Sequence, residues 1–84
     1  MQILDRHLVK AVVDLAVFLG FSSEDILDAD ASIAAMEQLA LELGRMPVEN
    51  KREFVEITLG LASDYGEKEG FVSGLAQSLG LQEK

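Results

Sequence analysis

His7 is the only histidine in this 84-residue chain and the first side chain to consider for catalysis. Imidazole exchanges a proton near neutral pH, and it acts as a general acid or base when a suitable side chain is paired with it. No serine, cysteine or acidic residue can be paired with His7 from local spacing, and Arg6 and Lys10 flank it. A zinc site needs at least three nitrogen or sulfur ligands, which one histidine and no cysteine cannot supply. The sequence therefore predicts no catalytic residue and no metal site.

Asp28 and Asp30 have the spacing of the first two ligands of a calcium-binding loop. Such a loop requires glycine at its sixth position and glutamate at its twelfth. Counted from Asp28, these positions are occupied by Ile33 and Leu39. Because both diagnostic residues are missing, we interpret the two aspartates as helix-capping residues.

Ser32 stands near the start of a predicted helix, in the stretch Asp30-Ala31-Ser32-Ile33. The size, acidity and helical order of the chain resemble those of the acyl carrier proteins, whose prosthetic group is attached to the serine of an Asp-Ser-Leu motif at a helix start. The resemblance implies an attachment site at Ser32. This chain departs from the family pattern, because Ala31 replaces the aspartate and the preceding loop is far shorter. We interpret Ser32 as a first-turn residue that assists the helix cap.

Phosphate-binding and acid–base sites are not indicated elsewhere. The seven glycines occur at the ends of predicted helices or inside them, and none follows a strand. Carboxylates are numerous, but their helical spacing is typical of solvated faces and brings no matched pair into an apolar pocket. We therefore expect a protein that is not an enzyme and that uses no cofactor.

A six-residue phrase recurs four times: Leu-Ala, two variable residues, Leu or Tyr, and Gly. Leucines one turn apart followed by glycine are typical of the last turn and the end of an amphipathic helix. The four copies end at Gly20, Gly44, Gly66 and Gly80. After two of these glycines, Phe21 and Leu81 can make the hydrophobic contact that closes a Schellman motif. The phrase thus predicts four helix ends, two of them sealed.

The predicted helices cover residues 3–19, a segment from Asp28 or Asp30 to Leu43, residues 48–65 and residues 67–79. A shorter helical turn within 22–30, with a capping-box pattern from Ser22 to Asp25, would place Ile26 and Leu27 on the core. The sequence therefore predicts an all-α fold, a compact bundle of four main helices plus one short helical turn. We expect a single helical domain covering residues 1–84.

The first predicted helix is apolar over more than half of its circumference. Its polar residues form one narrow stripe, and the residues expected on the opposite side are Leu4, Leu8, Val12, Leu15, Phe18 and Leu19. A helix this apolar is either the central element or half of an interface. In the last helix Gly70 and Gly74 recur at one-turn spacing, which fits either close approach of another backbone or a loosely formed helix.

Fifteen acidic and seven basic residues give a formal net charge of -8. This charge disfavours nucleic acid and anionic membranes, which require a positive surface, and it allows a basic protein partner. No signal-peptide pattern or membrane-length apolar run is evident, so we expect a cytoplasmic protein. With an aliphatic core and no cysteine, a chain of this size is marginally stable alone, which favours a partner or a homodimer.

Two functional interpretations remain open at this point. The first is an acidic protein-binding module, such as an immunity-type or regulatory inhibitor of a basic partner. The alternative is a self-associating structural or scaffolding module, most simply a homodimer. The candidate partner-binding residues are a carboxylate row on residues 48–65, an acidic turn, and apolar residues in excess of core need: Glu49, Glu53, Glu56 and Asp64; Glu24, Asp25 and Asp28; Val17, Leu41 and Leu59.

Overall fold

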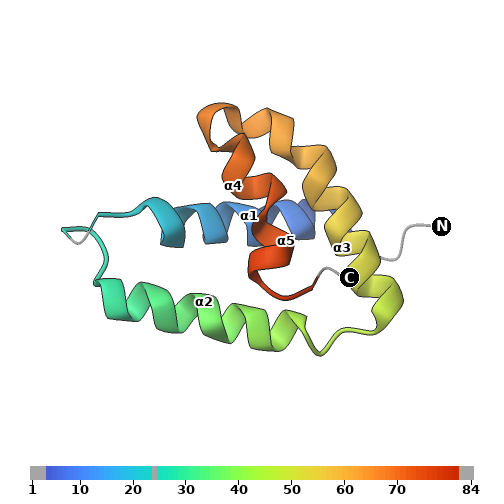
Figure 1. Cartoon of the computed structure of the whole chain (residues 1–84), viewed down its shortest axis with the longest axis horizontal. Helices are drawn as coiled ribbons and strands as arrows, with labels where there is room; N and C mark the ends of the chain where they lie inside the picture. Colours follow the sequence, from blue (N-terminus) through green and yellow to red (C-terminus); the bar gives the residue numbers. More distant parts are fainter. Residues whose placement is uncertain (1–3, 24, 82–84) are drawn as a thin grey trace.

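The computed structural model describes residues 4–23 and 25–81, which form helices and turns and contain no strand. The all-α class is therefore confirmed. The elements are α1 (Arg6–Phe21), α2 (Ala29–Leu43), α3 (Val48–Leu61), the 3-10 helix η1 (Ala62–Lys68), α4 (Glu69–Ser73) and α5 (Leu75–Ser78) (Figure 1). Three long helices and a series of short ones thus replace the four main helices that the sequence predicted.

The ends of α1 differ from the predicted 3–19. Asp5 caps the helix with a side-chain oxygen that accepts hydrogen bonds from the amides of His7 and Leu8. At the other end α1 continues through Gly20 to Phe21, and the hydroxyl and amide of Ser22 both donate to the Phe18 carbonyl. The predictions of a stop at Gly20 and of a capping box starting at Ser22 are therefore wrong. Gly20 instead leaves room for the Phe71 ring, since a Cβ there would lie 3.0 Å from its Cζ.

The turn after α1 is one hydrogen-bonded turn, in which the amides of Ile26 and Leu27 donate to the Ser23 carbonyl. Leu27 is half-buried, but Ile26 is 70% exposed, so its predicted place on the core is wrong. The predicted cap of the next helix is confirmed. Asp28 precedes α2, and its side chain accepts a hydrogen bond from the Ala31 amide.

The second half of the chain is more broken than the predicted helices 48–65 and 67–79. The α-helix ends at Leu61, and η1 follows as a tighter 3-10 helix with Gly66 at a φ of 56°. A second break occurs at Gly74, between α4 and α5. A Cβ at Gly70 would meet nothing within 4 Å, which contradicts the reading that this glycine admits another backbone.

The end of α5 has the predicted Schellman geometry. Gly80 has a φ of 75°, the Leu81 amide donates to the Ala76 carbonyl, and the Gly80 amide donates to the Gln77 carbonyl. Leu81 is 3% exposed, so the hydrophobic contact that seals this end is confirmed. The glycine with positive φ satisfies the last carbonyls and turns the chain back into the core.

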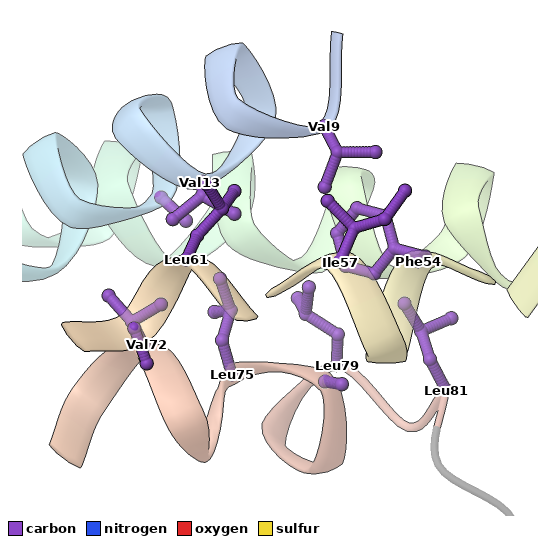
Figure 2. Close-up of a cluster of buried hydrophobic side chains, with 12 residues drawn as sticks. Val9, Val13, Phe54, Ile57, Leu61, Val72, Leu75, Leu79 and Leu81 are labelled. Atoms are coloured by element: carbon purple, nitrogen blue, oxygen red, sulfur yellow. The ribbon is translucent and has the colours of Figure 1, made fainter. Parts of the chain in front are cut away.

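The core lies where α3 and the C-terminal helices cover one side of α1 (Figure 2). From α1 the buried residues are Val9, Val13, Ala16 and Leu19, whereas Leu8 and Leu15 are 61% and 49% exposed. Of the predicted apolar side, Leu19 is buried and Leu4 and Val12 pack against the core, whereas Leu8, Leu15 and Phe18 are exposed, so the prediction is correct only in part. The remaining members of the core are Phe54, Ile57, Leu61, Ala62, Val72, Leu75, Ala76, Leu79 and Leu81.

Helix α2 is attached at the edge of this core and packs mainly on α1. None of its fifteen residues, all of which the structure describes, is buried. Met36, Leu39, Ala40 and Leu43 are half-buried against the core, and Ile33 is 59% exposed. Within the described part of the chain, no helix has the length and apolar character needed to cross a membrane.

Thr58 gives a test of how the core is packed. Its side chain is 1% exposed, and the Oγ1 atom has no hydrogen-bond partner among the described residues. Because a buried, unpaired hydroxyl is destabilising, we expect Thr58→Val to raise the free energy of unfolding by about 1 kcal/mol. Urea unfolding measures this change. Thr58→Ser, which keeps the hydroxyl and loses the methyl group, should lower stability, and a Val variant that is less stable than the wild type would contradict the assignment.

Candidate protein-binding site

The turn between α1 and α2 forms one end of the molecule, which we call the tip (residues 22–30). It lies opposite the end where α1 begins, α2 ends and α3 begins, which we call the base (Figure 1). Between residues 11 and 44 the sequence has no lysine or arginine. The described carboxylates of the tip, together with one from α2, are exposed: Asp25, Asp28, Asp30 and Glu37. The tip is therefore the most uniformly acidic part of the described surface.

Large apolar side chains are exposed beside these carboxylates. Phe21, Ile26 and Ile33 are 52%, 70% and 59% exposed. A hollow of about 440 Å³ lies next to them, lined by Leu19, Gly20, Ser22, Leu27, Ala29, Ser32, Ile33, Met36 and Glu37. Exposed apolar groups around a hollow, rimmed by charge, are typical of an interaction surface.

Phe21 is held in place by residues from the C-terminal half. Its ring makes an edge-to-face contact with Phe71, with centroids 5.0 Å apart. Lys68 reaches this end from η1, and its Nζ lies 5.1 Å from the centre of the Phe21 ring. The ring is thus fixed on one side while half of its surface remains open to a partner.

The predicted carboxylate row on α3 is less uniform in the structure. Glu49, Glu56 and Asp64 are exposed, but Glu53 is half-buried, and its Oε1 accepts a hydrogen bond from the Leu4 amide at 2.7 Å. Arg52 lies between Glu49 and Glu56 in helical order and is also exposed. This face therefore carries mixed charge, in contrast to the tip.

The other predicted partner residues divide into two groups. Leu41 and Leu59 are 53% and 49% exposed, as surface anchors must be. Val17 is half-buried and packs against the core, so its side chain is part of the core packing and is not a surface anchor. Glu24 lies outside the described residues.

A second apolar surface was not predicted as a site. Along the side of α1 that faces away from the core lie four exposed residues, which we call the α1 ridge: Leu8, Ala11, Leu15 and Phe18. Beside it, a groove of about 350 Å³ is lined by Leu15, Leu19, Ala35, Gln38, Leu39 and Glu42. The sequence signal for this surface was the apolar arc of the first helix, wider than half the circumference.

The residues first considered for chemistry lie apart from one another. His7 is exposed on α1, and the Ser32 hydroxyl is half-buried and donates to the Leu19 carbonyl at 2.5 Å, which joins α2 to α1. Among the described residues, no group of three histidine or acidic side chains could hold a metal ion. The hydrogen bond from Ser32 thus gives this side chain a structural role.

A polar cluster that was not predicted from the sequence joins η1 to α1. Tyr65 donates its hydroxyl to Asp14 Oδ1, and Lys10 Nζ lies 3.0 Å from Asp14 Oδ2. The pKa of Asp14 is lowered, first by the hydrogen bond from Tyr65 and then by that from Lys10. Burial, followed by the bond to Asp14, raises the pKa of Tyr65. The sequence prediction had treated Tyr65 only as an apolar residue ending a helix.

This cluster leads to a pH-dependent prediction for Tyr65→Phe. Because Asp14 has a lowered pKa in the folded state, its contribution to stability is present above the unfolded pKa and is lost as pH falls through the folded pKa. At pH 7 we expect the variant to lose at most about 1 kcal/mol of unfolding free energy, since the cluster is largely solvated. The difference from wild type should shrink as pH falls below about 4, the ordinary pKa of an aspartate. Thermal melts across this range measure it, and a pH-independent difference would contradict the role of Asp14.

Comparisons with known proteins do not place the chain in a family. No protein-family model, no curated protein and no solved structure matches it. The function must therefore be argued from the surfaces described above.

Proposed function

We propose that this protein is a non-enzymatic, cytoplasmic module that binds a basic protein partner at the tip. The observation that carries the proposal is the coincidence, at the tip, of exposed carboxylates with exposed apolar side chains around a hollow. The most specific form of the proposal is an immunity-type or regulatory inhibitor, which acts by covering a functional surface of its partner.

The charges and the apolar groups would serve different steps of binding. The exposed carboxylates of the tip attract a basic surface and accelerate the encounter, an effect that salt weakens. Side chains such as Ile26 and Ile33 supply affinity once water is excluded from them. A partner that fits this surface has lysine or arginine residues around one or more large apolar side chains.

The tip is a better candidate than the outer face of α3. Helix α3 combines Glu49 and Glu56 with Arg52, so a basic partner would meet repulsion as well as attraction there. Its exposed large side chains are Val48 and Leu59, at opposite ends of the helix. Both surfaces can be compared by experiment, because each carries exposed carboxylates.

The test compares two variants that remove the same charge. The partner is first captured from cells of the source organism, identified, purified and titrated against the wild type at several salt concentrations. We expect the triple variant Asp25→Asn/Asp28→Asn/Asp30→Asn to associate about tenfold more slowly at low salt. Asparagine at position 28 preserves the helix cap, so the fold of α2 should be unchanged.

The matched control is Glu49→Gln/Glu56→Gln/Asp64→Asn, which neutralises three carboxylates on α3 and η1. It should associate within about twofold of the wild type, whereas Ile26→Ser should mainly increase the dissociation rate. Equal effects of the two triple variants would show that net charge alone matters, and would remove the tip as the site. Failure to retain any basic protein would remove the proposed function itself.

A further inference from the structure

The α1 ridge is an apolar surface for which the monomer provides no cover. Leu8, Leu15 and Phe18 are 61%, 49% and 48% exposed. The spacing of the ridge, with steps of three, four and three residues, places its members on one line along the helix. Such a line is the contact surface that one helix presents to another.

The same face also carries a complementary groove. Beside the ridge, the groove between α1 and α2 has Ala35 and Leu39 among its lining residues, with Gln38 and Glu42 at its α2 side. A face with both a protruding ridge and an adjacent groove is suited to a two-fold interface, in which each copy supplies both parts. No other chain is needed to provide the matching helix.

We propose that two copies of this chain associate through this face, with α1 of one copy antiparallel to α1 of the other. The contact would join the two α1–α2 pairs into a four-helix layer. It would also cover part of α2, none of whose residues is buried in the monomer.

Charge selects the antiparallel arrangement. A two-fold axis along the helices would place the acidic tips of the two copies together, where like charges repel. An axis across the helices places each tip near the base of the other copy. The base balances its carboxylates with five basic side chains, which are Arg6, Lys10, Arg45, Lys51 and Arg52.

The antiparallel arrangement also matches the sizes of the ridge residues. With the axis near Val13, Leu8 of one copy faces Phe18 of the other, and Ala11 faces Leu15. The small Ala11 thus meets a large residue, whereas Leu8 and Phe18 form a pair of two large residues. Half-exposed apolar side chains of this size offer on the order of 100 Å² each, so the ridge supplies roughly 300–400 Å² per copy, and the groove and the residues that flank it must supply the rest of the roughly 800 Å² per partner of a standard interface.

This contact meets the proposed partner site at Leu19, which lines both the groove and the hollow, but the two sites use different flanks of α2. On α2, the groove residues Ala35, Gln38 and Glu42 lie on one flank, and Ile33 and Glu37, which line the hollow at the tip, lie on the other. Dimerisation therefore leaves that hollow open, and either proposal can fail without the other.

Sedimentation equilibrium at micromolar concentrations tests the dimer. We expect the wild type to have twice the 9.1 kDa mass of one chain. Leu15→Glu and Ala11→Glu should each weaken association at least tenfold, because they place a charge in the apolar contact. The matched control is Leu59→Glu, since Leu59 is also 49% exposed but lies on α3. It should dimerise as the wild type does.

Circular dichroism shows whether each variant keeps its helices, and Ala11→Glu remains informative if Leu15→Glu unfolds. A wild type that stays monomeric, or folded ridge variants that dimerise normally, would overturn the proposal. The orientation is tested with a short bismaleimide cross-linker on a chain that has no other cysteine. Ala11→Cys should cross-link between copies and Ser23→Cys should not. Because a parallel arrangement would bring each of these positions level with its own counterpart, cross-linking of Ser23→Cys would overturn the antiparallel arrangement.

Discussion

The contact of the buried side of α1 with α3 and the C-terminal helices is the interaction on which the rest of the structure depends. The α1 residues of the core cluster are Val9, Val13 and Ala16, which are short and lie on one line. Short side chains let Phe54 and Leu61 of α3 approach the helix, and Val72 and Leu75 complete the layer (Figure 2). The bulky residues of α1 are consequently left for its other sides.

Because the core forms on this one side of α1, the buried residues are distributed unevenly among the helices. Helix α3 and the C-terminal segments each contribute fully buried residues, whereas α2 is held by half-buried contacts and by the Ser32 hydrogen bond to α1. The α1–α2 pair extends beyond the core and carries most of the exposed large apolar side chains, from Leu8 to Leu41. The buried contacts that stabilise the fold are thus concentrated around α3 and the C-terminal helices, and the exposed apolar surface is concentrated on the α1–α2 pair.

The features that were predicted correctly from the sequence are those that depend on residues close together in the chain. The Asp28 cap and the Schellman end at Gly80 and Leu81 depend on residues a few positions apart, so short-range spacing was sufficient. Gly20 was misinterpreted because its role depends on Phe71, fifty-one positions away. For the same reason the buried side of α1 was predicted only in part, and the bond from Tyr65 to Asp14 was missed. Of the candidate site, sequence identified the acidic turn, and only the fold revealed the exposed Ile26 and Ile33 beside it.

Native-state hydrogen exchange tests most directly the claim that α1 anchors the core while α2 is held only at its edge. At concentrations low enough for a monomer, the amides of α2 should exchange with a lower opening free energy than those around Val13 in α1 and Leu61 in α3. Raising the concentration should increase the protection of α2 toward that of the core. Protection of α2 equal to that of α1 and α3 in the dilute monomer would contradict the account.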